Sequence, residues 1–96
     1  MITAFVWINS EVGTVPELAQ HLLDVDGVCE VYSVAGPYDL MAVIRVAEHD
    51  RLAEIVTAKI AAIPGVAKTH TVIAFRTYSR RDLEAMWSIG MEKGPV

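Results

Sequence analysis

The 96-residue sequence contains a single cysteine, Cys29, and no long uninterrupted apolar run. One cysteine cannot form a disulfide within the chain, which fits a reducing compartment. No apolar run reaches the ~18 residues that a membrane-spanning helix needs, and the first residues lack the basic stretch of a secretory signal. We therefore expect a cytoplasmic protein with no membrane partner. Because Cys29 lies in an apolar strand run, we expect its thiol to be buried and structural.

Positive charge is scarce and scattered. Eight Lys and Arg residues against twelve Asp and Glu residues give a formal net charge of −4. Only Arg80 and Arg81 are adjacent, with Arg76 nearby. A nucleic-acid-binding surface needs a concentrated basic face. We therefore expect no direct contact with nucleic acid.

Local motifs for catalysis, metals and cofactors are also missing. His21, His49 and His70 lie on a predicted helix, loop and strand, and no two of them have a ligand spacing such as H-x-x-x-H. The sequence contains no G-x-S-x-G and no Gly-rich phosphate loop. We expect a protein that is not an enzyme and holds no metal or cofactor, although a catalytic triad assembled in space stays open.

Apolar residues, by contrast, are abundant. They make up 53% of the chain, against a usual figure of about 45–50% that also counts glycine. A chain of this length forms one domain and buries a limited fraction of its own surface. The surplus indicates that other subunits cover part of the apolar surface, so we expect at least a dimer.

The apolar periodicity predicts the element order β-α-β-β-α-β. Strands are expected at 2–9, 28–34 and 40–46. A last, long strand is expected to include residue 66 and then residues 69–78. Thr14 and Glu17 fit a capping box at the start of the first helix, and Asp50 is expected to cap the second. The apolar stripes of the two helices contain Val15, Leu18, Ala19, Leu22 and Leu23, and then Leu52, Ile55, Val56, Ile60 and Ile63.

This split βαβ repeat predicts an α+β, ferredoxin-like fold over residues 1–78. Right-handed crossovers place both helices on one face of an antiparallel sheet. The strands carry apolar residues on both sides, and the first, Ile2 to Asn9, reads as buried on both faces. A bare second face would be too large an apolar patch for a stable monomer. We therefore expect the chain to dimerise through that face.

Residues 79–96 form a separate C-terminal tail. It has an S-x-x-D start, apolar residues at helical spacing (Leu83, Met86 and Trp87) and a glycine, Gly90, that ends the pattern. A short helix with a frayed end is expected. The helix would cover its own subunit's core or pack as an arm on a neighbouring subunit, unless the tail is disordered.

The turn Gly36-Pro37-Tyr38-Asp39 separates the two central strands. Asp39 places a carboxylate directly before five apolar residues, so it needs a partner, water or a ligand. It either hydrogen-bonds backbone amides of its own turn or accepts from the ammonium group of a ligand. Thr69 and Thr71 alternate on the last strand, so both hydroxyls point to one face.

These segments resemble a known family. The turn G-x-Y-D at 36–39 and the pattern G-V-x-x-T-x-T at 65–71, in this element order, are similar to the effector-binding (RAM) domain of the leucine-responsive/asparagine regulator (Lrp/AsnC) family. The resemblance implies a βαββαβ domain that dimerises through its sheets and assembles into octamers or related rings. It also implies that small effectors, usually amino acids, bind between dimers. The implied effector-binding residues are Gly36, Tyr38, Asp39, Thr69, Thr71, Val72, Ile73 and Ala74.

Full-length members of that family carry an N-terminal helix-turn-helix domain, whereas here Met1 leads directly into the first strand. The resemblance therefore indicates a stand-alone form of the domain. We expect a non-catalytic, oligomeric amino-acid sensor linked to transcription regulation, which either joins a full-length regulator or presents a ligand-dependent surface. The alternatives are a small dimeric ferredoxin-like enzyme, of the cofactor-free monooxygenase or isomerase type, with His70 or His21 facing an internal cavity, and a purely structural assembly module.

Overall fold

The element order β-α-β-β-α-β is confirmed by a computed structural model, which describes residues 1–11 and 13–80. The predicted tail helix lies outside the described residues. A π-helical stretch, η1, continues α2 and completes the second helix. The elements are β1 (Ile2–Ser10), α1 (Val15–Leu23), β2 (Val28–Ser33), β3 (Leu40–Val46), α2 (His49–Glu54), η1 (Ile55–Ile60) and β4 (Val66–Ala74).

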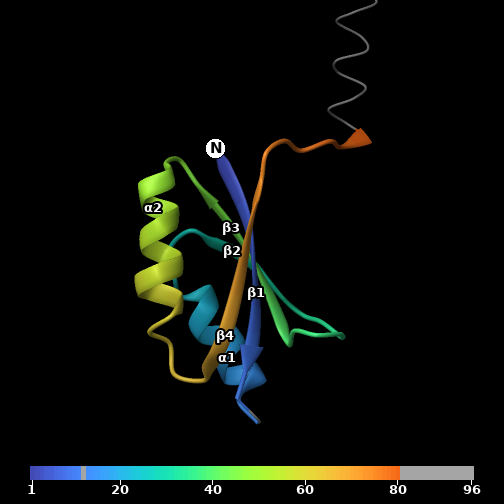
Figure 1. Cartoon of the computed structure of the whole chain (residues 1–96), viewed down its shortest axis with the longest axis vertical. Helices are drawn as coiled ribbons and strands as arrows, with labels where there is room; N and C mark the ends of the chain where they lie inside the picture. The colour runs from blue at the N-terminus through green and yellow to red at the C-terminus, as the bar shows by residue number, and fades with distance from the viewer. Residues whose placement is uncertain (12, 81–96) are drawn as a thin grey trace, which may run out of the picture.

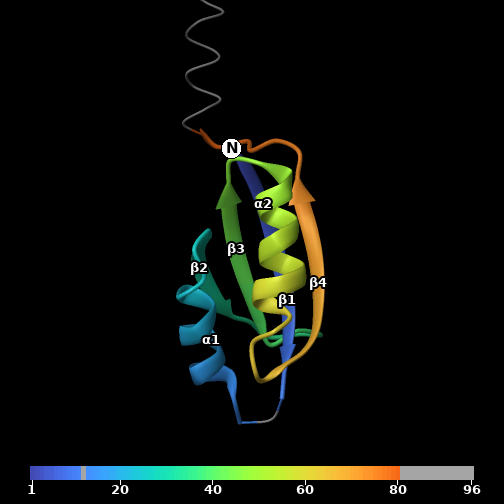
Figure 2. The same cartoon turned by 90° about the vertical axis from the view of Figure 1, so that its left-hand side faces the viewer.

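The four strands form one antiparallel sheet in the order β2-β3-β1-β4. Both helices lie on the same face of this sheet, and Figure 2 shows them side by side in front of it. Seen along the sheet in Figure 1, the helices occupy one side and the β2–β3 loop projects to the other. The predicted α+β, ferredoxin-like fold is therefore confirmed.

The hydrophobic core fills the space between the sheet and the helices. Every second residue of β1 points into it, and Ala4, Val6 and Ile8 are completely buried. The helices contribute most of their predicted apolar stripes, and Leu18, Leu22, Leu52, Ile55 and Ile60 are all buried against the same strands. The placement of Leu23 in the first stripe is wrong, because this side chain is 51% exposed. Burying side chains of this kind stabilises the fold by roughly 1.5–3 kcal/mol each.

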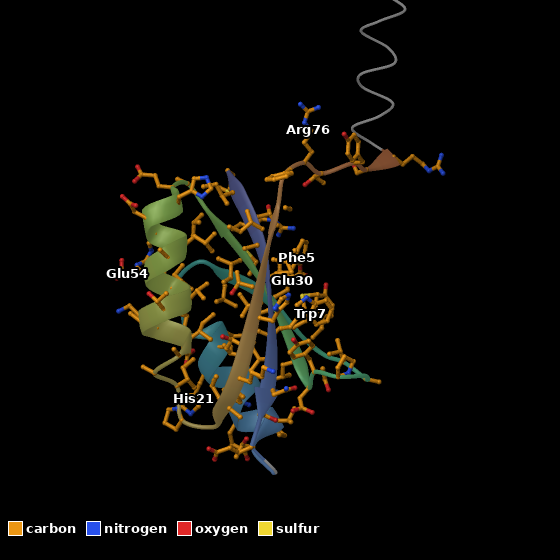
Figure 3. All side chains as sticks on the ribbon, viewed as in Figure 1. Phe5, Trp7, His21, Glu30, Glu54 and Arg76 are labelled. Atoms are coloured by element: carbon orange, nitrogen blue, oxygen red, sulfur yellow. The ribbon has the colours of Figure 1, made fainter. Side chains whose placement is uncertain are left out.

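The opposite face of the sheet, which we call the open face, carries no helix from residues 1–11 and 13–80 (Figure 2). Phe5 and Trp7 alternate with the buried residues of β1 and are only partly buried. Figure 3 shows Phe5, Trp7 and Glu30 together on this side, away from the helices. The prediction that β1 is buried on both faces is therefore wrong for the single chain, because strand alternation sends Phe5 and Trp7 to the open face.

Thr14 occupies the predicted N-cap position of α1, but the predicted capping box is wrong, and so is the predicted cap at Asp50. The Thr14 hydroxyl donates to the carbonyl of Glu11 at 2.7 Å and makes no cap hydrogen bond. Thr14 has φ −109° and ψ 4°, outside the extended region typical of a capping residue. The second helix begins two residues earlier than a cap at Asp50 requires, with Glu48 at the N-cap position.

Two further expectations fail at the sheet edges. Cys29 is exposed, because it lies where the β2–β3 register shifts between Val28 and Glu30. The strand β4 ends at Ala74, so the predicted extension to Tyr78 is wrong. Phe75, the next residue, is fully exposed. Among the described helices, none is long and apolar enough to cross a lipid bilayer.

Candidate functional site

Asp39 is held by the end of β1. Its Oδ2 accepts a hydrogen bond from the Ser10 backbone N–H at 2.8 Å and another from the Ser10 hydroxyl at 3.2 Å. The backbone N–H of Asp39 donates to the carbonyl of Ile8 at 2.9 Å, and its carbonyl accepts from Val34 at 3.0 Å. The Asp39 carboxylate therefore accepts from a backbone amide, as one of the two predicted roles required. That amide belongs to Ser10, 29 residues away, and not to the turn itself.

One oxygen of this carboxylate remains available. Among the described residues, no hydrogen bond reaches Oδ1 of Asp39, and the side chain is only partly buried. An ionised carboxylate can accept several hydrogen bonds at once. The arrangement therefore leaves room for a charge-assisted hydrogen bond from a cationic donor, which is of the stronger kind.

The rest of the turn projects into solvent. Ala35, Gly36 and Pro37 are exposed. Gly36 has φ +125°, a conformation that side-chain-bearing residues rarely adopt, although a Cβ at this position would meet nothing within 4 Å. Glycine is thus required by the backbone and not by crowding.

Tyr38 turns back from this loop over the open face. Its ring lies 5.9 Å from the ring of Trp7, tilted by 35°, and 6.2 Å from that of His70, nearly parallel at 21°. Trp7 and His70 are paired across β1 and β4. The three rings join the loop to two strands of the sheet, with separations typical of favourable aromatic contacts.

A hollow of about 370 Å³ lies beside these rings. Its volume falls near the lower end of the range for small-molecule sites, about 300–1,000 Å³. Its walls are mainly apolar and aromatic, so it suits an apolar or ring-shaped group. The residues that line it are Trp7, Val34, Ala35, Pro37, Tyr38, His70 and Val72.

The structure divides the predicted effector-binding residues between two faces of the sheet. Thr69, Thr71 and Ile73 pair with Ile8, Val6 and Ala4, so they lie on the helix-covered face, along the edge strand β4. Tyr38 and Val72 line the hollow on the open face. Ala74 shares the open face, paired with Thr3, but does not line the hollow.

Sequence reasoning did not assign Trp7, Val34, Ala35 or Pro37 to the site, and it considered His70 only for the enzyme alternative. Trp7 carries a readable signal, because it alternates with buried residues on a strand and so points away from the core. Its proximity to Tyr38 depends on the path of the loop, which has no local sequence signature.

The enzyme alternative needs a cavity between the sheet and the helices. That space is occupied by core side chains, and the hollow lies on the opposite face. Over residues 1–11 and 13–80, no three His, Cys, Asp or Glu side chains are grouped so as to hold a metal ion.

An exposed hydrogen bond on β2 perturbs one titrating group. The hydroxyl of Tyr32 donates to Oε2 of Glu30 at 2.7 Å. This bond, together with the negative charge of Glu30, raises the pKa of Tyr32 above its ordinary value, and Arg45 opposes the shift. Tyr32 faces the same side of the sheet as Trp7, because both pair with Met41.

Comparison with known proteins gives a consistent result. The chain is 35% identical over 75 residues to the HTH-type transcriptional regulator FL11 of Pyrococcus abyssi, covering 78% of this chain and 49% of that protein. The chain therefore spans about half the length of the curated relatives it matches. The structure of TTHA0845 from Thermus thermophilus superposes with a TM-score of 0.78 at 44% identity, covering 83% of this chain and all of that one.

The fold also matches more distant proteins. Escherichia coli AsnC superposes with a TM-score of 0.77 at 23% identity, over 83% of this chain and 54% of that chain. The family model for the Lrp/AsnC ligand binding domain matches residues 3–83, nearly the whole chain. The chain belongs to the Lrp/AsnC ligand-binding-domain family.

Proposed function

We propose that this chain is a non-catalytic sensing domain that binds a small effector, an amino acid, at the turn 36–39 and acts in transcription regulation without itself contacting DNA. The curated relatives are named as transcriptional regulators. A structural neighbour from Neisseria meningitidis, which at 11% identity shares only the fold, is described as a complex with L-methionine. A cytoplasmic location fits this role.

The observation that carries the proposal is the separation of the predicted site residues within one chain. Asp39 and Gly36 belong to the loop, whereas Thr69 and Thr71 lie along the β4 edge on the helix-covered face. We infer that an effector that uses both sets lies between two chains, with the turn of one facing the β4 edge of another. Asp39 would accept from the effector's ammonium group, and the Gly36 amide and the threonine hydroxyls would hold its carboxylate.

Association through the open face supports this arrangement. The face presents Trp7, Phe5, Val72 and Tyr32, which no helix of the described part of the chain covers, and Val72 and Tyr32 are 42% and 46% exposed. Contiguous apolar patches of this kind typically mark interaction surfaces. We propose a dimer formed by two such sheets, further assembly of dimers into a ring, and co-assembly with a full-length regulator of the same family.

Direct DNA binding is not part of the proposal. The four Lys and Arg residues within residues 1–74 are outnumbered by nine Asp and Glu residues. A surface of this charge repels the phosphate backbone, which usually dominates affinity for DNA. A gel-shift titration in which the chain alone retards DNA would contradict this part of the proposal.

Isothermal titration against the twenty amino acids tests the effector proposal. We expect heat of binding for at least one of them, and a loss of roughly 1.5–3 kcal/mol in Asp39→Ala because a charged contact disappears. Asp26→Ala is the matched control, since the Asp26 side chain is 96% exposed and lies at the far end of α1. Absence of heat with every amino acid, or equal binding by Asp39→Ala, would refute the sensor assignment.

A mixing experiment tests whether the site lies between chains. Asp39→Ala and Thr71→Val are each expected to lose binding when pure. When the two variants are co-refolded, some sites combine an intact turn with an intact β4 edge, so binding returns in a fraction of the sites. If the mixture binds no better than either variant, the turn and the threonines do not act across an interface.

A further inference from the structure

Exposed apolar side chains concentrate at the end of β4 and just after it. Among the described residues, seven large hydrophobic side chains are exposed, and four of them lie within residues 72–78: Val72, Ile73, Phe75 and Tyr78. Phe75 is fully exposed and Tyr78 is 70% exposed. Aromatic residues are enriched at protein interfaces, where they are covered by a partner. We call residues 75–80 the arm.

The arm also differs from the rest of the domain in charge. It contains Arg76 and Arg80 and no acidic residue, whereas residues 1–74 carry four basic and nine acidic residues. Opposite charges steer two surfaces together. A second copy of this chain therefore offers the arm a complementary surface.

The arm lies far from the hollow of its own chain. Phe75 follows His70 by five residues, which corresponds to about 17 Å along an extended strand. The pairing of Ala74 with Thr3 holds β4 in place up to its last residue. In Figure 1 the arm and the β2–β3 loop leave opposite ends of the sheet, and both extend away from the helices. Figure 3 likewise places Arg76 beyond the sheet end and distant from Trp7.

We propose that residues 75–78 of one copy dock in the Trp7–Tyr38–His70 hollow of a second copy, and that the exchange is reciprocal. A two-fold axis that runs across the strands brings the arm end of one sheet over the hollow end of the other. Such an interface repeats the same contact twice. The hollow of about 370 Å³ has room for an aromatic ring, since an engineered cavity of roughly 150 Å³ holds benzene.

The docked arm would act on the effector turn. Tyr38 forms a wall of the hollow and precedes Asp39 directly in the chain. A ring from the partner that packs on Tyr38 would fix the loop from which Asp39 and Gly36 reach the effector. Arm docking and effector binding therefore favour each other, because each stabilises the same loop conformation.

Disulfide trapping between two different variants tests the proposal. Ala35→Cys places a thiol on the rim of the hollow, and Thr77→Cys places one between Phe75 and Tyr78, with both rings retained. Both variants are made in a Cys29→Ser background. After mixing and mild oxidation with glutathione disulfide, we expect a reducible dimer that contains one chain of each kind. Leu23→Cys, which is 51% exposed on α1, replaces Thr77→Cys as the matched control and should give none.

Two further variants complete the test: one lacks the Phe75 ring, and one carries both cysteines in the same chain. Phe75→Ser combined with Thr77→Cys should reduce trapping at least tenfold. If Ala35→Cys and Thr77→Cys give no more cross-linked dimer than Ala35→Cys and Leu23→Cys, the proposal is overturned. It is also overturned if a single chain that carries both Ala35→Cys and Thr77→Cys forms the disulfide only within itself. The proposal rests on the open-face dimer, so sedimentation of the unmodified chain separates the outcomes. A dimer without trapping refutes the arm alone, whereas a monomer refutes the dimer as well.

Discussion

The two faces of the sheet both carry apolar side chains but have different roles. On the helix-covered face, Val6 and its neighbours are completely buried by α1, α2 and η1. On the open face, Trp7 and Phe5 are partly buried by other strand residues and by Tyr38. Strand alternation sends apolar residues to both faces, but among the described residues helices cover only one of them (Figure 2). The fold therefore depends on one face, and we infer that association depends on the other.

The largest expected effect comes from matched valines on the two faces. Val6→Ala removes fully buried methyl groups from the helix-covered face and should lower the free energy of unfolding by roughly 1.5–3 kcal/mol. Val72→Ala removes the same groups from a side chain that is 42% exposed in the single chain, and should lower the free energy of unfolding of the monomer by less than about 1 kcal/mol. Urea denaturation measures both. Equal losses would contradict the division between a folding face and an association face.

A smaller effect is expected at Asp39, where the loop is fastened to β1. Asp39→Ala leaves the Ser10 backbone N–H without its acceptor, and should lower the free energy of unfolding by about 1 kcal/mol because the site is only partly buried. Asp39→Asn retains an acceptor and should recover most of that loss, although it abolishes the charge offered to an effector. The comparison separates the structural role of the side chain from the binding role. If both variants unfold alike, the Ser10 contact does not fasten the loop.

The sequence predicts the fold well, since the decisive signals are local. Leu18, Leu22, Ile55 and Ile60 recur at helical spacing, and the structure buries all four in one core. The capping box at Thr14 and the cap at Asp50 were mispredicted because a cap depends on backbone angles as well as residue type.

The candidate site is less predictable for a different reason. The partner of Asp39 is Ser10, which is 29 residues away, so no local pattern reveals it. Strand alternation alone predicts that Thr71 and Val72 lie on opposite faces of the sheet. The register of β4 with β1 then shows that the threonines lie on the helix-covered face. What sequence alone does not provide is the path of the loop that places Tyr38 over Trp7.

Neighbouring residues of β4 test the association face directly. Val72 and Ile73 have nearly equal exposure, 42% and 45%, but lie on opposite faces of the sheet. Val72→Asp should shift the dimer toward monomer in analytical ultracentrifugation, because it leaves an unpaired charge between two sheets. Ile73→Asp should leave the dimer intact. Each change should alter the free energy of unfolding of the monomer by no more than about 0.5 kcal/mol, as expected for surface substitutions. Dissociation by Ile73→Asp alone would assign the dimer to the other face.

The smallest expected effect concerns Tyr32, which is on the open face but interacts mainly with its own strand. The hydrogen bond to Glu30 stabilises the protonated phenol and raises its pKa. A raised pKa means that this contribution to stability is complete below the unfolded value of about 10 and is lost as the pH rises through the folded pKa. Glu30→Gln should therefore lower the pKa of Tyr32, and Arg45→Gln should raise it further.

Ultraviolet titration of phenolate absorbance measures this pKa. Because the chain has three tyrosines, the Tyr32 signal is the difference from Tyr32→Phe. An open face covered by a second sheet adds a burial penalty for the phenolate. The pKa of Tyr32 should thus be higher in the unmodified dimer than in the Val72→Asp monomer. If the two values are equal, Tyr32 lies outside the interface, and association uses only the part of the open face around Trp7.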